Sequence, residues 1–313
     1  MSYTTKIKEE IASIENTKSE MIAELAGFIR NNGTISDNKI ILTTENKKTV
    51  ERIKLFIKNL YNTELKIETK DNANFSKKEL VVMNIDNNVD SILKDLGFID
   101  TEGNILLTPP TYIVGANEEI RAYLRGVFLC CGSINDPKTS RYHMELLIST
   151  PDEAVFVQKL LNIFDLNAKI LNRDKGYMIY LKEAEKISDY IKILGAHNAV
   201  MYFENVRIYR EQKNKTNRLN NCEQANIDKV VATATVQLEQ IRIIEETSSV
   251  DLLDDKTKET LEYRKKYPEA SLKELSEIIS LETSKPITKS GLNHRLRKIK
   301  ELADRLAKSN EKK

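Results

Sequence analysis

Two stretches of the chain, Met21–Gly33 (MIAELAGFIRNNG) and Glu119–Gly132 (EIRAYLRGVFLCCG), repeat one pattern, and this repetition limits the fold more than any other feature. Each stretch predicts a helix that carries a glycine in its interior and ends at another glycine. A glycine inside a helix is less favourable than alanine by about 1 kcal/mol. Because Gly27 and Gly126 stand at the same register, they predict a close crossing of two helices with no side chain between the backbones. Two unrelated buried helices with incidental glycines are the alternative.

The segments that follow the two helices favour a duplication of about 100 residues. The interval from Gly33 to Gly97 is 64 residues, and that from Gly132 to Gly195 is 63. The predicted order in both halves is helix, two strands, helix, two strands, helix. Apolar periodicity places the elements of the first half at Lys39–Thr44, Asn46–Tyr61, Glu64–Thr69, Glu79–Ile85 and Val89–Phe98. Those of the second half are placed at His143–Thr150, Pro151–Phe164, Ala168–Asn172, Tyr177–Leu181 and Ala184–Leu194.

Helix start signals precede both glycine-containing helices. Thr17 with Glu20 has the spacing of a capping box. Asn117 is expected to cap the second helix, with Glu118 and Glu119 in its positively polarised first turn.

The pattern L-A-G followed by two apolar residues and a closing glycine resembles the motif of LAGLIDADG homing endonucleases. The resemblance implies that the two helices pack on a pseudo-twofold axis and that the flanking sheets form a saddle for DNA. It also implies an acid just before the last glycine of each helix, which holds a catalytic metal. Here those positions are Asn32 and Cys131. Since hard cations need oxygen ligands, usually charged ones, we expect no catalytic residue, no metal and no cofactor.

The C-terminal region predicts an all-α domain. Its pattern predicts helices at Asn226–Glu246, Asp251–Tyr267 and Leu272–Ile279, a turn at Ser280–Ile287, and a last helix to about Ala307 capped by Thr288 or Ser290. Ser271 and Glu274 form a second capping box. A short capped helix, a turn and a longer basic helix are typical of a helix-turn-helix, and this one resembles region 4 of sigma factors.

The last helix has an apolar side at Leu292, Leu296 and Ile299, which is expected to pack inward. Asn293 and Arg297 then lie one turn apart on the outer side, where Asn pairs with adenine and Arg with guanine. Lys289 and Lys298 are expected at phosphates, whereas Arg295 either reaches a phosphate or packs at the edge of the domain. The predicted DNA-binding residues are Ser271, Lys273, Thr288, Lys289, Ser290, Asn293, His294, Arg295, Arg297 and Lys298.

Charge is distributed unevenly. Residues 256–313 contain 16 Lys and Arg against 9 Asp and Glu, a net charge of +7, whereas residues 1–255 contain 33 against 38, a net charge of −5. This places the electrostatic signature of DNA binding near the C-terminus and argues against a strongly DNA-binding saddle in the first part.

The segment Lys213–Ala225 is polar and rich in asparagine, and composition predicts a solvated hinge. A basic arm that reaches a phosphate through Lys213, Lys215 and Arg218 is the alternative.

Other functional classes have little support. Cys130, Cys131 and Cys222 form neither a disulfide framework nor a C-x-x-C pair, and the three histidines lack partners at ligand spacing. No run of about 18 apolar residues predicts a membrane span, and the charged N-terminus is not a signal peptide. The compartment is expected to be the cytoplasm, at the nucleoid.

Over residues 1–305 the chain resembles the WhiA family, regulators of sporulation and cell division in Gram-positive bacteria. The phrase from Asn217 to Asn226 resembles that family's signature at the domain junction. The resemblance implies a non-enzymatic, sequence-specific transcriptional regulator that binds double-stranded promoter DNA. A second regulator or RNA polymerase is a further partner left open. The alternatives are a protein-interaction adaptor with incidental DNA binding, and an active endonuclease with ligands such as Asp37 or Asp136.

The expected fold class is α+β, a duplicated two-lobed LAGLIDADG-like domain followed by an all-α helix-turn-helix domain. The expected boundaries are 1–98 for repeat 1 with a leading helix packed on it, 99–117 for an extended connection, 118–212 for repeat 2, 213–225 for a linker, 226–308 for the helix-turn-helix domain and 309–313 for a polar tail.

Overall fold

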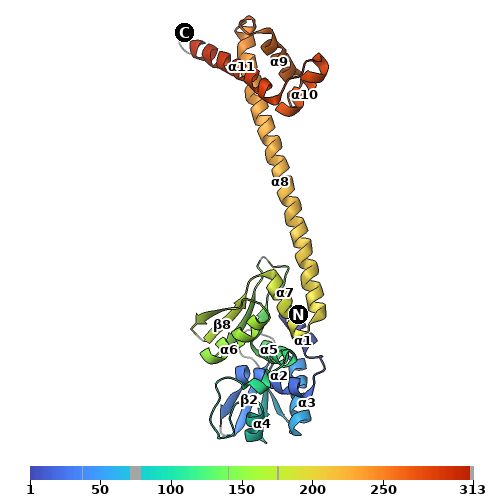
Figure 1. Ribbon diagram of the computed structural model, residues 1–313, viewed down its shortest axis with the longest axis vertical. Coiled ribbons are helices and arrows are strands. Elements are labelled where there is room, and N and C mark those ends of the chain that lie inside the picture. The colour runs from blue at the N-terminus through green and yellow to red at the C-terminus, as the bar shows by residue number, and fades with distance from the viewer. Residues whose placement is uncertain (37, 71–78, 140, 175, 311–313) are drawn as a thin grey trace. The chain divides into compact units, whose positions relative to one another are not determined.

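The computed structural model describes residues 1–36, 38–70, 79–139, 141–174 and 176–310. The chain divides into two compact units, Met1–Glu211 and Gln212–Lys313. The first is built from helices and sheets and the second from helices alone, which confirms the α+β class with an all-α C-terminal domain (Figure 1).

The first unit contains the same order of elements twice. After the leading helix α1 (Tyr3–Ile11), the first repeat consists of α2 (Lys18–Asn32), β1 (Thr34–Ser36), β2 (Lys39–Thr44), α3 (Lys47–Tyr61), β3 (Lys66–Lys70), β4 (Leu80–Ile85) and α4 (Val89–Asp95). The second consists of α5 (Asn117–Cys131), β5 (Gly132–Ile134), β6 (Met144–Ile148), α6 (Pro151–Ile163), β7 (Lys169–Arg173), β8 (Gly176–Leu181) and α7 (Ala184–Leu194). The predicted ranges agree with these elements to within a few residues. The first strand of each sheet has no range of its own in the sequence pattern, because three residues are too few to show one.

The two sheets have the same topology. The strand orders are β1-β2-β4-β3 and β5-β6-β8-β7, and every neighbouring pair is antiparallel. Equivalent registers accompany equivalent orders, with Leu42 opposite Met83 in the first sheet and Leu146 opposite Ile179 in the second. The internal duplication is therefore a structural one.

Helices α2 and α5 cross at their interior glycines. A Cβ atom on Gly27 would lie 2.4 Å from the carbonyl oxygen of Tyr123, and one on Gly126 would lie 2.0 Å from that of Glu24. No side chain fits at such distances, so the two backbones meet directly. The surrounding apolar residues of both repeats form one continuous core.

Two local expectations need correction. The N-cap residue of α5 is Ala116, whose N–H donates to Glu119 Oε2 (2.9 Å), and Asn117 is already the first helical residue. The prediction that Asn117 caps this helix is wrong, because Asn117 lies inside the helix and the N–H that Glu119 satisfies is that of Ala116. Helix α1 packs on more than the first repeat, since Thr4 Oγ1 donates to Ile134 O (2.9 Å).

The connection between the repeats is only partly extended. Ile99 and Ile105 form an isolated bridge, and a 3-10 turn, η1, covers Thr111–Ile113. From α2, the Arg30 guanidinium donates to the carbonyl of Leu106 (3.0 Å) and to that of Gly97. These bonds attach the connection to the motif helix.

The second unit contains the C-terminal part of α8 (His197–Glu246), η2 (Val250–Leu252), α9 (Asp255–Lys266), α10 (Leu272–Thr283) and α11 (Lys289–Asn310). Its core gathers one apolar side from each helix: Ile241, Ile244, Leu261, Leu275, Ile279, Leu292, Leu296 and Ile299. The Ser271–Glu274 capping box is confirmed by Ser271 N donating to Glu274 Oε2 (2.8 Å) and Glu274 N donating to Ser271 Oγ (3.2 Å). Helix α10 continues to Thr283, so the turn is shorter than predicted.

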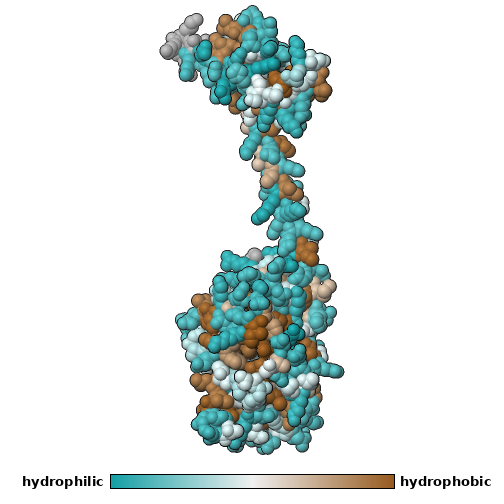
Figure 2. Space-filling model, viewed as in Figure 1, coloured by the Kyte–Doolittle hydropathy of each residue, from teal (hydrophilic) through white to brown (hydrophobic). Residues whose placement is uncertain are grey.

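The predicted break between two helices is absent from residues 213–225, which are helical within α8. Residues 211–229 are exposed throughout, and the predicted apolar positions Ile227 and Val231 are 56% and 50% exposed. Figure 2 shows scattered apolar side chains among hydrophilic ones on this helix. Composition misled here because asparagine is only moderately unfavourable in a helix, and a helix that has started gains one hydrogen bond for each added residue.

Candidate nucleic-acid interface

Asn32, at the position equivalent to the first catalytic acid, is hydrogen-bonded to the backbone of strand β2. Asn32 Nδ2 donates to Thr43 O (2.8 Å), and Thr43 N donates to Asn32 Oδ1 (2.7 Å). The amide thus acts like one more residue paired with β2. A carboxylate could accept the Thr43 N–H but could not donate to the Thr43 carbonyl.

The second equivalent position is also turned toward backbone. The Cys131 and Cys130 thiols both donate to Val127 O, each at 3.1 Å. Among the described residues, no group of three or more His, Cys, Asp or Glu side chains could hold a metal.

The acids considered for a nuclease with other ligands do not supply such a site. Asp136 accepts a hydrogen bond from the Tyr202 hydroxyl (3.1 Å) and another from Lys138 N (2.9 Å). Asp37 lies outside the described residues. Asp136 therefore stabilises local structure.

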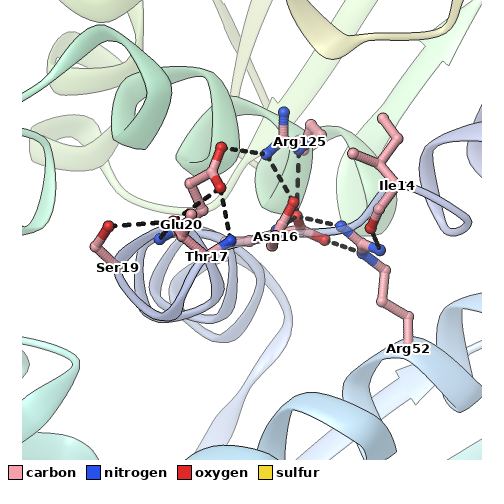
Figure 3. A network of polar contacts seen from close by, with 8 residues as sticks. Ile14, Asn16, Thr17, Ser19, Glu20, Arg52 and Arg125 are labelled. Carbon is pink, nitrogen blue, oxygen red and sulfur yellow. Dashed lines mark hydrogen bonds and ion pairs between the residues drawn. The ribbon is translucent and has the colours of Figure 1, made fainter.

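Buried charges instead tie the repeats together around Glu24, which is fully buried on α2. Arg52 of α3 and Arg125 of α5 both reach this cluster, in which Asn16 accepts a hydrogen bond from Arg125 Nη2 (3.1 Å) (Figure 3). Arg52 Nη2 donates to Glu24 Oε2 (2.8 Å), and Arg125 Nε donates to the same oxygen (3.3 Å). Sequence reasoning missed this cluster, and only the position of Glu24 three residues before Gly27 could have indicated it.

A second buried carboxylate, Glu153 on α6, lies on the other side of the crossing. Its Oε1 accepts from the Tyr123 hydroxyl (2.5 Å) and from Asn31 Nδ2 (3.1 Å). Burial raises the pKa of Glu153, and the two hydrogen bonds only partly oppose that shift. The polar groups of the motif helices are thus largely satisfied within the fold.

In the second unit, a cap fixes where α11 begins, and its apolar residues fix which side of the helix is buried. Gly291 N donates to Thr288 Oγ1 (3.1 Å), so Thr288 rather than Ser290 is the cap. Leu292, Leu296 and Ile299 are buried, as predicted. The helix therefore exposes its opposite side, namely Lys289, Ser290, Asn293, His294, Arg297 and Lys298.

Two basic residues of the predicted set have partners on α9 or at its start. Arg295 Nη1 donates to Lys256 O (3.1 Å), which matches packing at the edge of the domain. Lys298 Nζ donates to Asp254 Oδ2 (2.7 Å), and this bond lowers the pKa of that carboxyl. A phosphate contact by either residue would require it to leave this partner.

Asn293 and Arg297 line a groove of about 690 Å³ between α11 and α8, together with Val236 and Gln240 of α8. Ser290 and His294 do not line it. Among the predicted residues of α10, the Ser271 hydroxyl is used by its cap, and Lys273 lies 3.9 Å from Glu277.

The charge difference between the units is smaller than the division at residue 256 suggests. Gln212–Lys313 contains 21 Lys and Arg against 17 Asp and Glu, a net charge of +4, and Met1–Glu211 contains 28 against 30, a net charge of −2. The sign of the asymmetry remains, and the basic excess lies in α9–α11.

Three family models match the chain in series. They are the WhiA N-terminal LAGLIDADG-like domain at residues 18–99, the WhiA LAGLIDADG-like domain at 120–213 and the WhiA C-terminal HTH domain at 216–303. The chain belongs to the WhiA family. The WhiA models divide the chain close to the boundary between the two units.

Individual WhiA proteins support the same conclusion along the whole chain. The probable cell division protein WhiA of Staphylococcus epidermidis is 40% identical over 310 residues, covering 98% of both chains. That of Enterococcus faecalis is 39% identical over 313 residues, again covering 98% of both. The crystal structure of full-length DUF199/WhiA from Thermotoga maritima shares the fold, with a TM-score of 0.60 at 21% identity over 97% of this chain and 99% of that one.

Among the described residues, no helix has the length and apolar character needed to cross a membrane.

Proposed function

We propose that this WhiA-family chain is a non-enzymatic, sequence-specific DNA-binding transcriptional regulator. The observation that carries the proposal is the N-terminal half of α11, where Ser290, Asn293, His294 and Arg297 are exposed. No hydrogen bond or ion pair within the described residues engages these four side chains. Side chains of this kind at the start of the second helix of a helix-turn-helix read base edges in the major groove.

The charges along α11 limit the part of the helix that is proposed to approach DNA. Glu301 lies one turn beyond Arg297 on the exposed side and Asp304 follows, so the side of α11 that carries Asn293 and Arg297 becomes acidic at that point. DNA approach is therefore proposed for Lys289–Lys298. Lys289 and Lys273 contact phosphates, and Thr288 and Ser271 support the helix starts as caps.

The first unit has a different role in this proposal. Its net charge of −2 and the internal use of its polar motif residues argue against a strong DNA saddle. It positions the helix-turn-helix unit or recruits a second regulator or RNA polymerase. The names of the relatives, probable cell division proteins, support a role in cell division. Chromosome segregation, and sporulation in spore formers, belong to the same proposal. The protein would act in the cytoplasm at the nucleoid.

The test is binding of the full chain to promoter fragments and to random DNA over a range of salt concentrations. A DNA reader shows a steep fall of log K with log salt, together with a preference for its own promoters. A flat salt dependence without preference would favour the adaptor. Incubation of plasmid with Mg²⁺ or Mn²⁺ should leave it intact, and divalent-dependent nicking would favour the endonuclease.

A further inference from the structure

Three lysines from three helices converge on one small groove of the second unit. Lys229 comes from α8, Lys273 is the second residue of α10, and Lys289 is the first residue of α11. The groove measures about 220 Å³. A water molecule occupies about 30 Å³, so the groove has room for a larger polar group.

No acid lines this groove among the described residues. Its other lining residues are Val230, Thr233, Arg264, Ala270, Ser271 and Leu272. Neither Lys229 nor Lys289 forms an ion pair with any described residue, and the contact of Lys273 with Glu277 is long at 3.9 Å. Like charges that converge without a counter-charge repel one another, so the arrangement favours an anion.

The wall of the groove adds a buried positive charge. Arg264 is 1% exposed and forms no ion pair with a described carboxylate. Its Nη2 donates to the carbonyls of Tyr267 (3.0 Å), Pro268 (2.7 Å) and Ala270 (2.8 Å), while its Nε has no hydrogen-bond partner among the described residues. Arg264 therefore shapes the turn that leads into α10 and leaves its charge uncompensated.

Backbone donors complete the set. Leu272 and Lys273 are the first two residues of α10, and N–H groups at these positions have no acceptor within their own helix. Such groups bind phosphate, and ammonium groups strengthen the contact.

We propose that Lys229, Lys273 and Lys289 form a clamp for a single backbone phosphate of bound DNA. The inference rests on the proposed function and extends it, because it makes α8 a DNA-contacting element. The same chemistry would accept a free inorganic phosphate, so the experiment separates the two sources.

The experiment compares full-length Lys229→Ala, Lys273→Ala and Lys289→Ala with Lys308→Ala. Lys308 is an exposed lysine in the last turn of α11 and serves as the control. Because the three lysines share one phosphate, each clamp variant should lower the salt slope by up to about 0.9, which is at most roughly fivefold in affinity near 0.15 M salt, equally for promoter and random DNA. Lys308→Ala should match the parent.

Neutral methylphosphonates placed one at a time in the DNA identify the phosphate. One position should weaken binding of the parent and of Lys308→Ala more than it weakens binding of any clamp variant. Parental binding by Lys229→Ala would overturn the clamp, as would three separate sensitive positions for the three lysines.

Titration of the DNA-free protein with inorganic phosphate tests the second source. Phosphate that binds in a Lys229-dependent manner, while Lys229→Ala binds DNA normally, would assign the groove to a free anion and overturn the proposal. If the parent shows no salt-dependent DNA binding, the proposed function fails, and that result is distinct from all of these.

Discussion

The crossing of α2 and α5 and the exposed side of α11 use polar residues in opposite ways. At the crossing, Glu24 is fully buried between two arginines, and Asn32 forms paired hydrogen bonds with strand β2. On α11, Asn293 and Arg297 are exposed and have no partner among the described residues. Polar groups satisfied inside the fold stabilise it and have little capacity left for a ligand. A LAGLIDADG-like fold can therefore keep its architecture when the polar groups at its helix crossing are used within the fold.

The largest effect is expected from the buried charges at the crossing. Glu24→Gln leaves Arg52 without a counter-ion and leaves Arg125 only its longer pair with Glu20 (3.7 Å). Breaking a buried pair in this way lowers the free energy of unfolding by about 3–5 kcal/mol. Chemical denaturation of the first unit measures the loss. Glu185→Gln is the control, because its pair with Arg207 is largely exposed and should contribute at most about 1 kcal/mol. Equal stabilities of the two variants would show that the cluster is not a structural core.

The glycine contact gives a matched comparison within helices. Gly126→Ala places a Cβ 2.0 Å from Glu24 O, whereas Gly291→Ala on α11 meets nothing closer than 3.5 Å. We expect Gly126→Ala to lower the free energy of unfolding by about 3 kcal/mol through overpacking. Gly291→Ala should raise stability by up to about 1 kcal/mol. Thermal melts in which the two alanine variants change stability equally would contradict the close crossing of α2 and α5.

On α11 the expected effect is on binding rather than stability. Arg297→Ala and Asn293→Ala should each lower affinity for promoter fragments by about 1–3 kcal/mol and relax sequence preference. Lys289→Ala should weaken promoter and random DNA alike. Fluorescence anisotropy with both kinds of DNA measures the difference. An equal loss on both DNAs would mean that Asn293 and Arg297 do not read bases.

Restoring an acid at the positions equivalent to the catalytic acids tests whether the missing carboxylates alone account for the expected lack of nuclease activity. Asn32→Asp removes the donor to Thr43 O, which is partly buried, and the loss of stability should lie toward the lower end of about 1–3 kcal/mol. We expect the double variant Asn32→Asp/Cys131→Asp to remain without Mg²⁺-dependent nicking activity on plasmid DNA. Nicking by this variant would show that the acids alone were missing.

The smallest effect concerns pH. Burial raises the pKa of Glu153 above its value of about 4.3 in the unfolded chain. The unfolded chain therefore ionises first, and the stability contributed by protonated Glu153 is lost as pH rises through the folded pKa. Glu153→Gln should match the parent near pH 4 and become the more stable of the two toward pH 8. Denaturation curves at several pH values measure this, and a constant difference across that range would contradict it.

Sequence patterns were enough to predict the duplication, the order of its elements, the crossing register of the two glycines and the helix-turn-helix unit. These predictions follow from local periodicity, from caps such as Thr17 and Ser271, and from interior glycines that are unfavourable in a helix unless they serve a contact. The chain also showed that Asn32 and Cys131 are not carboxylates. Each of these features can be recognised from local sequence patterns or from the repetition of such patterns.

The partners of the polar residues, in contrast, depend on the three-dimensional fold. Lys298 donates to the Asp254 carboxylate and Arg295 donates to the backbone carbonyl of Lys256. These partners lie about 40 positions away in the chain, and no local pattern encodes such pairs. The same holds for Arg125 with Glu24, and for Lys229, which sequence composition treated as part of an ordinary helix. Residues 213–225 are helical because helix propagation is cooperative, whereas composition reports only individual preferences. Periodicity reveals which side of a helix is apolar, but the partner of each charged side chain depends on which elements the fold brings together.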